Sequence, residues 1–116
     1  MHQTLHRLFR YKAWANDELL SALTRLGAEN RITQLAIKAL SHTHVGDRIF
    51  AAHLRRQRHP YHAANLSELP SLEQLAAQTS DSDREYLEYV PALTTAELGE
   101  TIDFSFTDGA PGRMSR

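Results

Sequence analysis

The sequence predicts an all-α fold with three main helices and a short extended segment. Three runs of apolar residues recur at intervals of three and four, which is the periodicity of an amphipathic helix. One later run, "TIDFSF", alternates Ile102, Phe104 and Phe106 with polar residues, as a strand does. No internal repeat or low-complexity tract interrupts the 116 residues, so we expect one domain over residues 1–116.

The first helix is expected from about Thr4 to Leu26, with Gly27 as its stop. Asn16 lies on the apolar stripe of this helix. A buried amide needs hydrogen-bond partners, so we expect Asn16 to face the bundle interior or His42 on the next helix.

The second and third helices are separated by a long polar connection. Helical periodicity runs from Ile32 to Leu54, and the connection "RRQRHPYHAANLSELP" carries two prolines. Ser71 and Gln74 then match a capping box that opens the third helix, which Pro91 ends or bends.

The last segment of the sequence leaves two structures open. "TDGAPG" has turn chemistry, and Ser115 near the end of the sequence is a good N-cap for a further helix. Four helices are the commoner solution for a bundle with connections this long. An ordinary tail made of the extended segment and the turn is an equally good interpretation.

Composition excludes several classes of function. The net charge of −1 gives no basic field for nucleic acid, and the apolar runs are too short to cross a membrane or form a secretory leader. The absence of cysteine excludes disulfides, zinc–thiolate sites and a cysteine nucleophile, and it favours the cytoplasm. Any metal site must therefore use His, Asp or Glu.

Three of the seven histidines, His42, His44 and His53, lie on the second helix. A helical wheel that takes Ile32 as its inward reference places His42 and His53 beside the apolar face and His44 toward the polar side. His42 and His53 are about 16 Å apart along the helix, so they cannot bind one metal ion together. We therefore expect His53 to be a half-buried packing residue and His44 to be peripheral.

The remaining histidines give weaker signals. His59 and His62 lie in the polar connection, where solvated loop residues are the simpler interpretation. His2 and His6 have the spacing of a helical metal-binding pair, but they occupy the first turn of a terminal helix, which tends to fray.

Three segments together resemble DinB-like proteins, a superfamily of bacterial helical-bundle metalloenzymes named for damage-inducible members. These segments are "LFRYKAWANDELLSAL", "ALSHTHVGDRIFAAHL" and "DFSFTDGAPGRMSR". The resemblance implies an up-and-down four-helix bundle, usually a homodimer. It also implies a nickel or zinc ion held by one His of the second helix and an H-x-x-x-H pair of the last helix. The position that matches the first ligand is His42.

The resemblance implies that the H-x-x-x-H pair should follow soon after Arg116, where the sequence ends. We therefore expect a C-terminally truncated domain with an incomplete metal site. The implied function is that of a divalent-metal-dependent enzyme, a transferase that uses a low-molecular-weight thiol or a hydrolase, acting on a small-molecule substrate. The alternative is a catalytically inactive helical module that self-associates as a homodimer or higher oligomer. Neither interpretation involves nucleic acid or a membrane.

Overall fold

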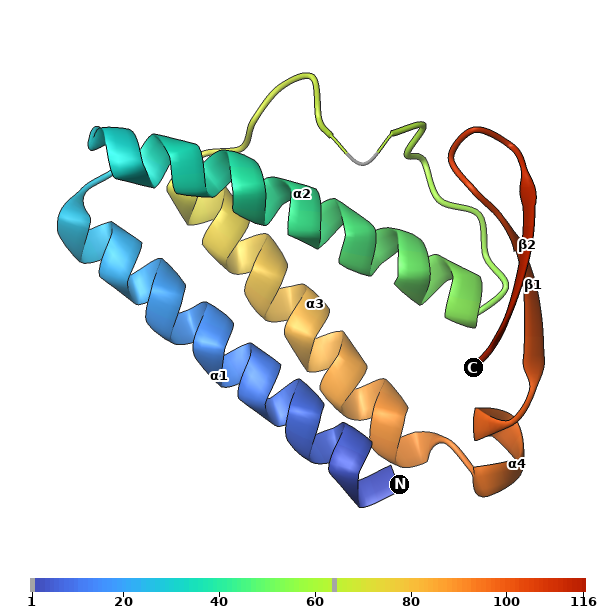
Figure 1. The fold of residues 1–116 in the computed structure, drawn as a ribbon. Helices are drawn as coiled ribbons and strands as arrows, with labels where there is room; N and C mark the ends of the chain where they lie inside the picture. The colour runs from blue at the N-terminus through green and yellow to red at the C-terminus, as the bar shows by residue number, and fades with distance from the viewer. Residues whose placement is uncertain (1, 64) are drawn as a thin grey trace.

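The computed structural model describes residues 2–63 and 65–116 and is mostly helical (Figure 1). Three long helices are followed by one short helix and a two-stranded antiparallel hairpin. This arrangement confirms the predicted three main helices and the extended segment. The elements are α1 (His2–Leu26), α2 (Arg31–Leu54), α3 (Leu72–Ala92), α4 (Thr95–Leu98), β1 (Thr101–Ser105) and β2 (Pro111–Ser115).

Local capping chemistry sets the helix boundaries. Helix α1 ends just before Gly27, whose φ of +101° is a left-handed conformation. Glycine adopts this conformation without strain because it has no side chain. Asn30 then caps α2 by accepting a hydrogen bond from the backbone N–H of Ile32. Ser71 and Gln74 form the predicted capping box of α3. Pro91 lies inside the last turn of α3, which ends one residue later.

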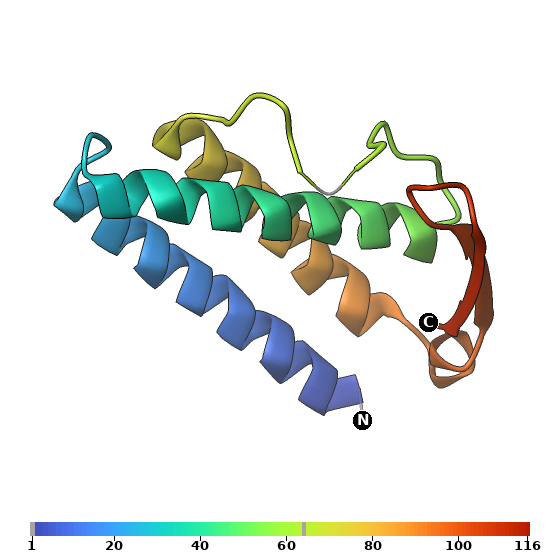
Figure 2. The same cartoon turned by 45° about the horizontal axis from the view of Figure 1, so that its top comes forward.

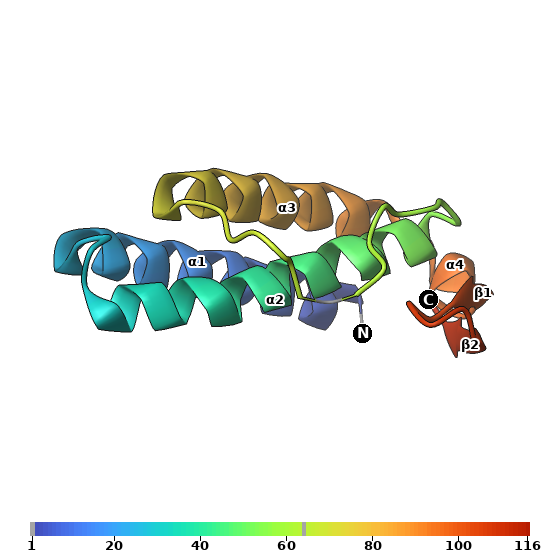
Figure 3. The ribbon, with the colours of Figure 1, turned by 90° about the horizontal axis from the view of Figure 1, so that it is seen from above.

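The third helix lies between the other two. Helix α3 packs against both α1 and α2, which contact each other much less (Figures 1 and 2). Seen from above, α3 forms one layer and α1 and α2 form the other (Figure 3). The molecule is flat, with extents of 47 × 33 × 16 Å. Its main apolar core joins the three helices through Leu20, Leu23, Ile37, Leu72 and Leu75.

The rotation of α2 about its axis differs from the prediction. Ile32 and Leu35, which were expected to face inward, are 64% and 61% exposed, whereas Ile37 and Val45 are buried. Helix α2 carries two apolar stripes, and periodicity alone cannot tell which of them meets α3. The side chains at positions 33, 37, 41 and 45 form the buried face instead. As a result, His44 is half-buried and His42 is exposed, so the placement of His42 beside the apolar face and of His44 toward the polar side was wrong.

A second strand follows the predicted one. Strand β2 pairs with β1 in antiparallel register, with Phe104 opposite Gly112, and Ser115 is the last residue of β2. Gly109, at a φ of +90°, supplies the left-handed residue of the connecting turn. A side chain at Gly112 would collide with the ring of Phe104, so this glycine lets the ring lie across β2. Within the described residues, no helix is both long and apolar enough to cross a bilayer.

Candidate functional site

His42 lies on the exposed surface of α2, and a hydrogen bond holds its imidazole ring. Its Nδ1 is 3.0 Å from Oδ1 of Asn65 in the connection between α2 and α3. Because an amide oxygen can only accept, this contact assigns the proton to Nδ1 and leaves the Nε2 lone pair free. Metal-binding histidines are commonly held in this way, with one ring nitrogen donating to an oxygen and the other available for the ion.

The described residues do not complete a three-ligand metal site around His42. Across residues 2–63 and 65–116, no three His, Asp or Glu side chains lie close enough together to hold an ion. A zinc site in an enzyme normally takes three ligands from the protein. His42 therefore fits one corner of a metal site, and the described residues do not supply the other corners.

His53 is a packing residue, as predicted, although it is buried rather than half-buried, with an exposure of 7%. Its ring lies 4.7 Å from the ring of Phe104 on β1 and 6.0 Å from that of Phe50, measured between centroids. Burial lowers the pKa of His53, and the neighbouring His59 lowers it further. Its imidazole is therefore neutral near pH 7 and joins α2 to the hairpin.

His44 is directed toward the side of α2 that packs on α3. Its Nδ1 is buried, and it has no hydrogen-bond partner among the described residues. Burial lowers the pKa of His44, and the positive charge of Arg48 lowers it further. The helical wheel missed this residue because the assigned rotation of α2 was wrong.

A charged cluster at the centre of the molecule joins all three long helices. Lys12 Nζ on α1 lies 2.8 Å from Asp47 Oδ2 on α2 and 2.6 Å from Asp83 Oδ1 on α3. Asn16 Nδ2 donates to Asp83 Oδ2 at 2.9 Å, which confirms that Asn16 faces the bundle interior. Sequence reasoning missed Lys12, although it lies one turn before Asn16 on the same face of α1.

The charges of this cluster hold Lys12 in its protonated form. Burial lowers the pKa of Lys12, but hydrogen bonds and opposite charges from Asp47 and Asp83 outweigh this effect and leave the pKa raised. Asp83 is buried, so its carboxylate depends on Lys12 and Asn16 for compensation. A lysine held in this way is a poor base, and its role is to fix the helices relative to one another.

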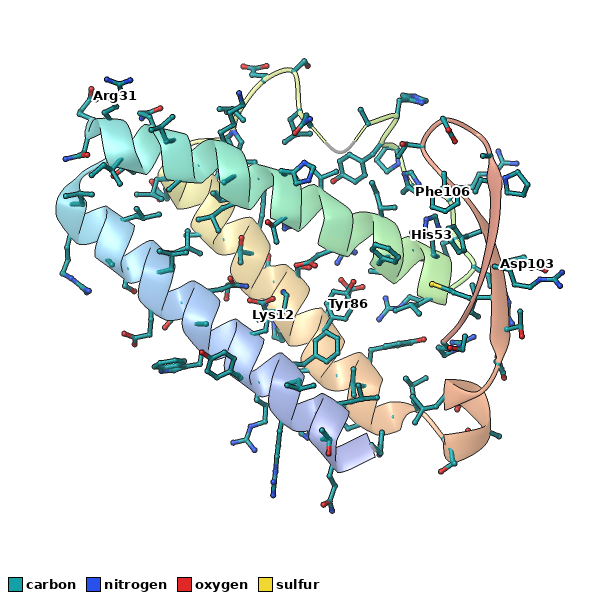
Figure 4. The ribbon with its side chains drawn as sticks, in the orientation of Figure 1. Lys12, Arg31, His53, Tyr86, Asp103 and Phe106 are labelled. Carbon is teal, nitrogen blue, oxygen red and sulfur yellow. The ribbon has the colours of Figure 1, made fainter. Side chains whose placement is uncertain are left out.

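Tyr86 on α3 extends the cluster toward the α1–α3 interface (Figure 4). Its hydroxyl donates to the backbone carbonyl of Asp47 at 2.5 Å, and its ring stacks on Phe9 with centroids 5.1 Å apart. Lys12 Nζ lies 5.9 Å from the centre of the same ring. Burial raises the pKa of the Tyr86 hydroxyl, so this group is a hydrogen-bond donor and does not ionise near neutral pH.

Two of the other histidines, His2 and His59, have hydrogen bonds with the backbone. His2 Nε2 lies 2.5 Å from the carbonyl oxygen of Val90, and this contact attaches the start of α1 to the end of α3. His59 Nδ1 accepts a hydrogen bond from the backbone N–H of Tyr61 within the connection. Both contacts are structural.

Comparison with models of protein families, with curated proteins and with solved structures gives no match for this chain. Among the described side chains, His42 is the predicted metal ligand, and Asn65 orients its ring.

Proposed function

We propose that this chain supplies part of the site of a divalent-metal-dependent enzyme like the DinB-like proteins, with His42 as one metal ligand. The observation that supports the proposal is the Asn65 contact, which leaves Nε2 of His42 free on an exposed face of α2. Metal-binding histidines commonly have this arrangement, in which one ring nitrogen donates to an oxygen and the other can take the ion.

The ion we propose is nickel or zinc, because imidazole nitrogen is a good ligand for both. Its remaining ligands would come from a second copy of the chain or from a segment that the described residues do not include. When bound with an open position, such an ion lowers the pKa of a thiol or water ligand, which suits a thiol-dependent transferase or a hydrolase.

The contribution of the chain itself is to hold the imidazole in place. Asn65 fixes the ring, and the ion pairs of Lys12 with Asp47 and Asp83 fix α2 relative to α1 and α3. A rigid helix places a ligand more accurately than a loop does.

A second candidate function is a catalytically inactive module that self-associates. The observation that favours it is the set of large apolar side chains that α1 and α2 leave exposed, among them Leu19, Ile32, Leu35 and Phe50. Exposed apolar patches of this kind mark interaction surfaces.

Zinc titration followed by NMR of the histidine ring nitrogens tests the metal-site proposal. The Nε2 signal of His42 should shift first, and His42→Ala should remove that response. The His44→Ala variant is the matched control. It removes the imidazole two positions along α2, on the side of the helix that faces α3. A response lost in His44→Ala but kept in His42→Ala would reject the assignment, and no response up to millimolar zinc would favour the inactive module.

A further inference from the structure

A cavity of about 630 Å³ lies at the C-terminal end of α2, between the α2–α3 connection and strand β1. It is separate from His42, which is about 16 Å away along the helix axis. Figure 4 shows His53 on the side of α2 that meets the hairpin. The size is typical of a small-molecule site.

One wall of this cavity consists of flat rings. His53 lies 4.7 Å from Phe104 and 5.4 Å from His59, measured between ring centroids. All three residues line the cavity. A wall of this kind stacks against a flat, apolar part of a ligand.

The rim of the cavity is basic, and its charges are only partly compensated. Arg56 and Arg58 both line the cavity. Glu100 binds Arg116 at 3.0 Å and reaches Arg56 only at 3.4 Å. Arg58 makes no ion pair within residues 2–63 and 65–116. The one acidic residue of the lining, Asp103, is paired with Arg113.

The backbone at Arg56 provides an independent argument. Arg56 has a φ of +54°, and no other non-glycine residue of the described chain has a positive φ. It occupies the left-handed position after α2, where Gln57 N–H donates to the carbonyl of Ala52 at 2.8 Å, as in a Schellman motif. Glycine avoids the strain of this position. A positive charge for the helix dipole is already available from Arg55, so the dipole does not explain an arginine here.

We propose that this cavity binds a small molecule in which a carboxylate or phosphate is attached to a flat apolar group. Arg56 and Arg58 bind the anionic group, and the flat group stacks on the half-buried rings of Phe104 and His59. The guanidinium groups suit this role because they donate two parallel hydrogen bonds to an oxyanion. The inference does not depend on His42 or on a metal ion.

Calorimetric titration with phenyl phosphate tests the proposal, with inorganic phosphate and phenol as the two partial probes. Phenyl phosphate should bind saturably and more tightly than either partial probe, because only it contacts both the basic rim and the ring wall. Benzoate then distinguishes the two oxyanions, and binding of either aromatic anion supports the site. Equal binding of phenol and phenyl phosphate, or no saturable binding of either aromatic anion, would overturn it.

Two variants separate loss of the site from loss of the fold. Arg56→Gly should weaken phenyl phosphate binding roughly tenfold and at the same time raise the melting temperature, since glycine relieves the backbone strain. Arg58→Ala should weaken binding with little change in stability. Arg31→Ala is the control, because it removes the same charge at the opposite end of α2 (Figure 4). Wild-type affinity in both Arg56→Gly and Arg58→Ala would reject the proposed anion contacts.

Discussion

At the scale of single residues, Lys12 connects more of the structure than any other charged side chain described above. It lies between two carboxylates from two different helices, at 2.8 Å and 2.6 Å. Its side chain is 30% exposed, while that of Asp83 is 7% exposed. Removing a lysine from such a position leaves Asp83 buried with only the Asn16 amide as a partner, which is costly.

We therefore expect Lys12→Met to lower the free energy of unfolding by about 2 kcal/mol. This is less than the cost for a fully buried pair, because Lys12 keeps part of its surface in water. Urea denaturation at pH 7 measures the change. The control is Arg84→Met, which breaks the exposed pair with Asp81 and should cost less than about 0.5 kcal/mol. Equal losses in the two variants would contradict a central role for Lys12.

At the scale of elements, side-chain caps determine where the helices start. The capping box of α3 uses Ser71 Oγ, which accepts from Gln74 N–H at 3.1 Å, and Gln74 Oε1, which accepts from Ser71 N–H at 3.0 Å. A second capping box, between Thr94 and Glu97, opens the short α4 and was missed in the sequence. Four residues give too little apolar periodicity to reveal a helix.

The cap of α3 makes a direct prediction about stability. Ser71→Ala should lower the free energy of unfolding by about 1 kcal/mol, because the N-terminal N–H groups of α3 lose their acceptor. The same substitution at Ser80, which is exposed in the middle of α3, should leave stability unchanged or slightly higher, since alanine favours helix. Thermal unfolding followed by circular dichroism compares the two. A Ser71→Ala variant as stable as wild type would show that the cap is dispensable.

At the scale of the whole molecule, the flat arrangement of helices leaves apolar stripes uncovered. On α1 and α2, eight large hydrophobic side chains, Tyr11 and Trp14 among them, are 44% to 65% exposed. The molecule is only 16 Å across in its thinnest direction. Three helices in so flat an arrangement leave at the surface many apolar side chains that a closed bundle would bury. These uncovered stripes are Leu8, Leu19 and Leu26 on α1, and Ile32, Leu35 and Phe50 on α2.

We expect the chain to form a homodimer at tens of micromolar, because two-fold self-pairing is the commonest way to cover such a surface. Leu35→Lys, in the uncovered stripe of α2, should shift the chain toward the monomer in sedimentation velocity. Leu69→Lys is the control, since Leu69 is also exposed but lies in the α2–α3 connection. A wild-type chain that sediments as a monomer at this concentration would rule out the dimer.

Much of the fold could be predicted because its signals are local. The boundaries of the three long helices follow from apolar spacing, from the left-handed Gly27 and from the cap at Ser71, and each signal lies within a few residues of the structure it controls. The inward position of Asn16 was also predictable, since an amide on an apolar stripe needs a buried partner.

Only the tertiary structure decided which face of α2 is buried and which polar groups meet. Both apolar stripes of α2 satisfy helical periodicity, and the choice between them depends on how the side chains of α3 fit, which no local pattern contains. Two other features also bring together residues that are far apart in the sequence. They are the ion pairs of Lys12 with Asp47 and Asp83, and the cavity between Arg56 and β1. Local sequence signals therefore determined where the helices begin and end. Long-range packing determined which side chains meet between the helices, and no local pattern contains that information.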